Sequence, residues 1–289
     1  MKLSLKVAGL IFALVAIALI AGCAKQPGGT GATTSQSDAN TINVLVPCGQ
    51  TGPYFEIKDL FIKANPDVKV QELSENIAVI TRKVLDGDSP EVFMSMGDRE
   101  VTQLEQKDRI IPDTRTAYAI NALVLIAPKG NPAKVKDLKD VAGPAVKRFV
   151  VVNPDESSAG FHSKEALQKL GIWDKVVAKT QVPDQPGMVD EILAKGDAEA
   201  GIGYWPCLTE SRVPGSGPTP KKRIAIAQII PQDLYTPFKC EAAVIKGCKN
   251  PELGKKFIDF MMEPQSQAIF AKWNFTDPNQ STKEQPKAK

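Results

Sequence analysis

Short apolar runs, rich in β-branched and aromatic residues, alternate with stretches of helical periodicity along most of this chain of 289 residues. Such runs are typical of buried strands, and an apolar period of 3.6 residues is typical of helices packed on a sheet. Strands are expected at residues 42–46, 68–70, 92–94, 122–127, 149–152 and 200–204, and helices at residues 51–64, 77–86, 159–170 and 188–195. The stop signals that follow these helices are, in order, Asn65-Pro66, Gly87, Gly171 and Gly196. The alternation predicts an α/β fold of mainly parallel sheets with helices on their faces, and the length favours two such lobes.

The amino terminus has the features of an export signal. After two lysines, residues 7–20 form an apolar run of 14, shorter than the roughly 20 residues of a membrane span. The run ends in Ile20-Ala21-Gly22-Cys23, which resembles the bacterial lipobox. That resemblance implies a lipoprotein signal peptide at residues 1–22 and a lipid anchor on Cys23. The alternative is an ordinary secretory peptide cleaved near Ala21.

The segment after the signal is rich in Gly, Thr, Ser, Gln and Pro and has no apolar periodicity, so residues 23–41 are predicted to be a flexible tether. The mature protein is therefore expected in the cell envelope, anchored by lipid on the periplasmic or extracytoplasmic side.

Charge and histidine content exclude several functions. The formal net charge is +3, and removal of Lys2 and Lys6 with the signal leaves about +1, which does not suggest nucleic-acid binding. His162 is the only histidine, so a zinc site that needs two imidazoles is excluded.

Five segments occur in the same order and at similar spacing in the bacterial molybdate-binding proteins, and the chain resembles this family. The segments are residues 88–95, 121–132, 158–167, 195–204 and 264–270. The resemblance implies a two-lobed periplasmic-binding-protein fold of type II, with two crossings at the hinge. It also implies that the protein delivers a tetrahedral oxyanion, molybdate or tungstate, to an ABC permease.

The resemblance and the strand pattern together divide the mature chain. Lobe one is expected at residues 42–121 and 240–289, and lobe two at residues 122–239. We expect a monomer that is not an enzyme and needs no cofactor. The expected partners are the oxyanion, the permease and, through the anchor alone, the membrane.

Helix amino termini that point into one cleft can bind a small anion, because their first N–H groups lack partners inside the helix. By resemblance, the ligand contacts are Gly49, Gln50, Thr51, Asn76, Ile77, Ser158, Ala159, Gly187 and Tyr204. Gly187 is included because Pro186, at the family's contact position, has no N–H to donate. None of these residues is charged, so the site is expected to prefer a full dianion over singly protonated phosphate. The alternative role of Thr51 and Ser158 is that of helix N-caps.

The cysteines leave a second interpretation open. Four remain after Cys23, namely Cys48, Cys207, Cys240 and Cys248, and in an exported protein they are expected as disulfides or small buried thiols. Alternatively, Cys48, His162 and Cys207 could hold a thiophilic metal ion, since thiolates favour soft ions. A cysteine-dependent enzyme would need Cys48 and His162 as its nucleophile and base.

Overall fold

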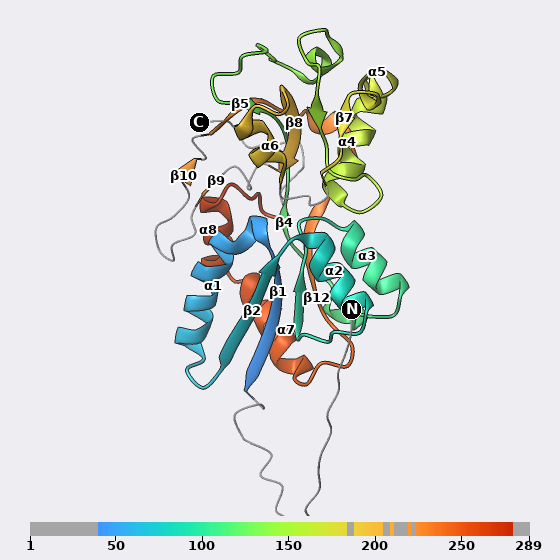
Figure 1. Ribbon diagram of the computed structural model, residues 1–289. Coiled ribbons are helices and arrows are strands. Elements are labelled where there is room, and N and C mark those ends of the chain that lie inside the picture. Colours follow the sequence, from blue (N-terminus) through green and yellow to red (C-terminus); the bar gives the residue numbers. More distant parts are fainter. Residues whose placement is uncertain (1–39, 184–187, 205–208, 211–218, 221–222, 280–289) are drawn as a thin grey trace, which may run out of the picture. The chain divides into compact units, whose positions relative to one another are not determined.

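A computed structural model describes residues 40–183, 188–204, 209–210, 219–220 and 223–279. Its main elements are two five-stranded sheets with flanking helices (Figure 1). The expected positions Gly187 and Cys207 lie outside the described residues, as do the predicted signal peptide and the predicted anchor Cys23. Among the described residues, no helix has the length and apolar character that a membrane crossing requires.

The first sheet has the strand order β2-β1-β3-β12-β4. Its strands are β1 (Thr41–Pro47), β2 (Lys69–Glu75), β3 (Val92–Met94), β4 (Thr116–Ile120) and β12 (Lys239–Val244). Strand β1 pairs in parallel with β2 and β3, whereas β12 runs antiparallel to both β3 and β4.

Both faces of the first sheet are covered because successive side chains of a strand point to opposite faces. Val44 and Val46 of β1 join a core with Tyr54 and Phe61, whereas Leu45 joins a separate cluster with Ile80. Helices α1 (Thr51–Ala64), α7 (Pro251–Met261) and α8 (Pro264–Lys272) belong to the first side, and α2 (Ile77–Leu85) and α3 (Arg99–Gln106) to the second (Figure 1).

The second sheet has the order β11-β5-β8-β6-β7. Its strands are β5 (Leu123–Pro128), β6 (Phe149–Val150), β7 (Thr180–Gln181), β8 (Ala200–Tyr204) and β11 (Ile224–Ile229), and its helices are α4 (Ser158–Lys169), α5 (Trp173–Val177) and α6 (Val189–Lys195). A two-stranded antiparallel pair, β9 (Thr209–Glu210) and β10 (Thr219–Pro220), stands apart. Short 3₁₀ helices are η1 (Cys48–Gln50), η2 (Pro112–Thr114), η3 (Leu138–Ala142) and η6 (Gln232–Leu234).

The predicted two-sheet α/β class is confirmed, but each sheet is more mixed than expected. Two of the four strand pairings in each sheet are antiparallel, because β5 and β12 pair with strands of opposite direction. The apolar pattern of a strand does not indicate in which direction the strand runs, so the sequence could not distinguish a parallel from an antiparallel pairing.

Candidate functional site

Three strands of the first sheet end at one edge. In the parallel register Pro47 of β1 lies beside Glu75 of β2, and Leu45 lies beside Phe93 of β3. The segments that follow these strands, beginning at Cys48, Asn76 and Ser95, therefore leave the same edge. In open α/β sheets this carboxyl edge is where ligands bind.

In the second sheet, the expected ligand contacts also lie at the carboxyl edge of parallel strands. Strands β6 and β8 are parallel, with Val150 beside Gly201, so the segment leading to α4 and the end of β8 at Tyr204 share an edge. Ser158, Ala159 and Tyr204 are all buried.

Ser158 is not the N-cap of α4. That position belongs to Ser157, whose hydroxyl accepts the N–H of Gly160 at 3.1 Å. Ser158 instead donates its N–H to Glu100 Oε1 at 2.9 Å and its hydroxyl to Glu100 Oε2 at 2.7 Å. An anion thus occupies two donors at the start of α4, and this anion is a carboxylate of the chain itself.

Glu100 is the centre of a buried group, the Glu100 cluster, which consists of Ser95, Gly97, Glu100 and Ser158. The Glu100 residue is only 3% exposed, and Ser95 Oγ donates to its Oε2 at 3.0 Å. Gly97 lies against Ser158 so closely that a Cβ on Gly97 would stand 2.2 Å from Ser158 Oγ. The close approach joins the segment after β3 to the first turn of α4.

Further contacts hold α3 to α4. The N–H of Arg99 donates to Ser158 Oγ at 3.3 Å, and the Arg99 guanidinium lies 3.9 Å from the centre of the Phe161 ring. These contacts fix the orientation of the Ser158 hydroxyl, which accepts from Arg99 while it donates to Glu100.

Gln50 reaches the same region from the first sheet. Its Nε2 lies 3.5 Å from the carbonyl oxygen of Ser95, which also accepts the hydroxyl of Tyr118 at 2.8 Å. Gln50 is fully buried, and no described residue donates to its Oε1. Thr51 is not an N-cap, because it is the first residue of α1 and its hydroxyl donates to the carbonyl oxygen of Cys48 at 3.0 Å.

The start of α2 is arranged differently. Asn76 caps this helix, with its Oδ1 accepting the N–H of Ala78 at 2.9 Å. Asn76 and Ile77 are buried, and Ile77 packs in the cluster that contains Phe93. Topology brings them to the carboxyl edge, but no hydrogen bond within the described residues joins them to the Glu100 cluster.

Tyr204 lies in an aromatic group beside α4. Its ring centre is 5.8 Å from that of Phe238, and the Phe238 ring is stacked on His162 at 4.4 Å. Tyr235 completes this group.

His162 lies between two carboxylates. Its Nδ1 is 3.0 Å from Glu165 Oε2, and its Nε2 is 3.7 Å from Asp98 Oδ1. Burial acts to raise the pKa of Asp98, but the neighbouring His162 imidazole and the charge of Arg115 outweigh it and lower that pKa. Burial likewise acts to raise the pKa of Glu165, and hydrogen bonds from Thr236 and His162 lower it overall.

Of the residues in the cysteine interpretation, the structure describes Cys48 and His162 but not Cys207. Cys48 is exposed, Cys248 is half-buried, and Cys240 is buried with its Sγ 3.5 Å from the carbonyl oxygen of Met96. Both nitrogens of His162 face carboxylates, so neither is directed at Cys48 as a general base would be. Within the described part of the chain, no three His, Cys, Asp or Glu side chains are grouped to hold a metal ion.

A cavity of about 470 Å³ borders the Glu100 cluster. It is lined by Asp98, Arg99, Glu100, Thr102, Gln103, Gln106, Asp155, Glu156, Phe161, His162 and Thr236. Four of these side chains are acidic, so the cavity itself does not offer an anion-binding lining.

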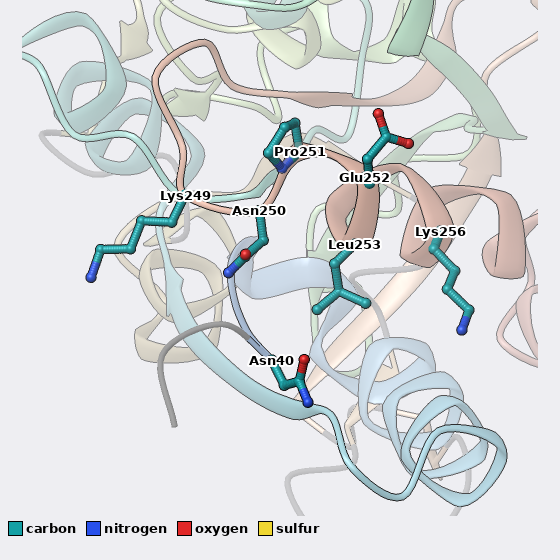
Figure 2. Close-up of a pocket in the computed structure, with 7 residues that line it drawn as sticks. All are labelled: Asn40, Lys249, Asn250, Pro251, Glu252, Leu253 and Lys256. Carbon is teal, nitrogen blue, oxygen red and sulfur yellow. The ribbon is translucent and has the colours of Figure 1, made fainter. Parts of the chain in front are cut away.

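A second cavity, of about 440 Å³, lies at the other end of β1, next to Asn40 (Figure 2). Its lining is Asn40, Lys249, Asn250, Pro251, Glu252, Leu253 and Lys256. Figure 2 shows the Lys249 and Lys256 side chains extending to opposite sides, so their ammonium groups do not converge on one point. None of the expected ligand contacts lines this cavity.

Sequence reasoning found Ser158 but missed Glu100, Ser95 and Gly97. Only their position could have indicated them, because they follow the strand at residues 92–94. The carboxyl end of that strand shares an edge with the segments after β1 and β2, which are expected to contact the ligand. No motif marks Glu100, whose partner Ser158 is 58 positions away.

Comparison with known proteins identifies the family. Residues 42–276 match the family model described as bacterial extracellular solute-binding protein. The molybdate-binding protein ModA of Escherichia coli is 26% identical over 244 residues, covering 83% of this chain and 90% of that protein. The Bacillus subtilis protein YvgL, named provisionally as an ABC transporter substrate-binding lipoprotein, is 22% identical over 92% of this chain and 96% of its own.

The fold is shared with a solved structure. The periplasmic molybdate-binding protein of Azotobacter vinelandii superposes with a TM-score of 0.68 at 21% identity, covering 82% of this chain and all of that chain. These relatives are solute-binding transport proteins and not enzymes. The chain is homologous to the molybdate-binding proteins and belongs to the family of bacterial extracellular solute-binding proteins.

Proposed function

We propose that this protein is the extracytoplasmic receptor of an ABC importer and that it binds a small tetrahedral oxyanion at the carboxyl edges of its two sheets. One observation carries the anion chemistry: the N–H and hydroxyl of Ser158 converge on a carboxylate, Glu100. Groups that hold a buried carboxylate in this way suit the oxygens of an oxyanion equally well.

Donors for such a ligand remain at both edges. At the start of α4, Ser158 donates to Glu100 and Gly160 to Ser157, which leaves the N–H of Ala159 without an acceptor in the described chain. At the start of α2, Ala78 donates to Asn76, and the N–H of Ile77 likewise has no acceptor among the described residues. The ligand would also draw on Gly49, Gln50 and Thr51, on the hydroxyl of Tyr204 and, by resemblance, on Gly187.

The two sheets would act as lobes. On this proposal, residues 42–121 with 240–289 form one lobe and residues 122–239 the other, and ligand contacts from both favour the closed state. The family relation makes molybdate and tungstate the first candidates within the class of tetrahedral oxyanions.

Attachment and delivery complete the proposal. Residues 1–22 would be removed as a signal peptide, Cys23 would carry the lipid, and residues 23–41 would let a monomeric receptor reach its permease from the membrane surface. The family model and YvgL, with its lipoprotein name, support this placement.

Calorimetric titration of the mature chain with molybdate, tungstate, sulfate, phosphate and arsenate tests the proposal. Ser158→Ala removes a hydroxyl that holds the Glu100 carboxylate at the start of α4. Oxyanion binding beside that carboxylate should therefore weaken by about tenfold, the value of one hydrogen bond near a charge. Ser163→Ala is the matched control, because its buried hydroxyl on the same helix donates to the carbonyl oxygen of Ala159 and does not touch Glu100. Equal losses in both variants, or no binding of any oxyanion to the unmodified protein, would contradict the assignment.

A further inference from the structure

The carboxylate of Glu100 changes what kind of oxyanion the site can accept. A carboxylate offers about four acceptor positions and donates nothing when ionised. Three are filled, by the Ser158 N–H on Oε1 and by the Ser158 and Ser95 hydroxyls on Oε2. One position on Oε1 therefore remains, next to the first turn of α4, where Ala159 still has a donor to offer.

Glu100 is held in this place. It stands in the first turn of α3, where the partial positive charge of the helix amino terminus favours an acidic side chain. The following turns of α3 are fixed by Val101 and Leu104, which are fully buried in the core. A carboxylate that left Ser95 and Ser158 would lose the hydrogen bonds that make its burial tolerable, so displacement by a ligand is unfavourable.

The Glu100 carboxylate therefore remains in place when a ligand binds beside it, and the ligand must be compatible with this acceptor. Molybdate, tungstate and sulfate carry no proton at neutral pH, so each would set an acceptor oxygen against an acceptor oxygen of the carboxylate, with no hydrogen between them. Phosphate and arsenate keep at least one proton, and that hydroxyl can donate to the open position on Glu100. Their remaining oxygens can accept from backbone N–H groups such as that of Ala159.

Resting on the proposed function, we propose that Glu100 is a specificity-determining residue that makes this protein a receptor for a proton-bearing tetrahedral oxyanion, inorganic phosphate or arsenate. Sequence analysis predicts the opposite preference, because it finds no acceptor among the expected contacts. The carboxylate that donates nothing and accepts one more hydrogen bond supplies that acceptor, and it disfavours oxyanions without a proton, because two acceptors would then face each other.

The test compares ligand ranking in the unmodified protein and in Glu100→Gln, measured by calorimetry on the mature chain in phosphate-free buffer at neutral pH. The amide keeps the shape of the carboxylate, removes its charge and turns one acceptor into a donor. The unmodified protein should bind phosphate and arsenate at least about tenfold more tightly than molybdate, tungstate and sulfate. In Glu100→Gln this ratio should fall by at least about tenfold, with the dianions gaining affinity.

Glu105→Gln is the matched control. Glu105 lies on the same helix and pairs with Arg115 instead of Ser158, so its loss should leave the ranking unchanged. If Glu100→Gln fails to fold, the ranking in the unmodified protein still decides the matter.

The outcomes separate the two proposals. Molybdate or tungstate binding as tightly as phosphate in the unmodified protein would overturn the role of Glu100 and leave the oxyanion receptor standing. A folded Glu100→Gln variant with an unchanged ratio of phosphate affinity to molybdate affinity would also overturn the role of Glu100 and leave the oxyanion receptor standing. Absence of binding by every tetrahedral oxyanion, in both proteins, would overturn the receptor proposal and the specificity proposal together.

Discussion

Replacement of Gly97 by alanine tests the contact on which the site depends. The new Cβ would stand 2.2 Å from Ser158 Oγ and 2.3 Å from Ser158 Cβ, distances that real Cβ atoms do not show. Ser158 has a short side chain anchored on a helix, so it cannot swing aside as a long chain would. Relief therefore requires the segment after β3 and the start of α4 to separate by about 1 Å.

A separation of that size breaks the hydrogen bonds of the Glu100 cluster. The Ser158 N–H and hydroxyl lie at 2.9 and 2.7 Å from the Glu100 oxygens, and an added ångström puts both beyond hydrogen-bond range. Each bond to a charged group contributes about 1.5–3 kcal/mol, so Gly97→Ala should lower the free energy of unfolding by about 3–6 kcal/mol. It should also weaken oxyanion binding, because Ser158 and Ala159 move together.

Urea unfolding and calorimetric titration measure these two effects. Gly203→Ala is the control, because a Cβ there would meet only Ile126 Cδ1 at an ordinary 3.5 Å. A Gly97→Ala protein as stable and as tight-binding as Gly203→Ala would show that the segment after β3 does not press on α4 in solution, and the geometry of the Glu100 cluster would be wrong.

Three further predictions address the cleft, the acid response and the anchor. Tyr204→Phe removes a hydroxyl expected to contact the ligand and keeps the ring, so oxyanion binding should weaken by about tenfold in calorimetry, and unchanged affinity would remove Tyr204 from the site. Asp98 and Glu165 have lowered pKa values, so the stability they contribute is present above their unfolded values of about 4 and is lost as pH falls through their folded values. His162→Gln removes their shared partner, so the loss of urea stability between pH 6 and pH 3 should be smaller than in the unmodified protein, and an equal loss would contradict this. Cys23→Ser should release the protein from the membrane fraction, and a variant that still sediments with membranes would place the anchor elsewhere.

The sequence predicts the positions of many helices and strands well, because neighbouring residues determine where these elements begin and end. Asn65-Pro66 ends α1 at Ala64, and Gly196, in a left-handed conformation, ends α6 at Lys195. The strand runs at residues 92–94 and 200–204 coincide with β3 and β8. Such signals depend on neighbouring residues and need no knowledge of the rest of the chain.

Long-range relations could not be predicted in the same way. The antiparallel pairing of β12 with β3 joins residues that are about 150 positions apart, and nothing local fixes its direction. The candidate site shows the same division. Donors at Ser158 and Ala159 follow from their place at the start of a helix, whereas the acceptor of Ser158 comes from Glu100 on α3, which the sequence analysis does not predict.

Native mass spectrometry of the mature protein, with and without added oxyanions, tests the central claim most directly. The account predicts a complex of one protein with one tetrahedral oxyanion, formed most readily with phosphate or arsenate in the unmodified protein and without that preference in Glu100→Gln. A protein that shows no mass shift with any oxyanion, or one that binds only a soft metal ion after reduction of its cysteines, would contradict it.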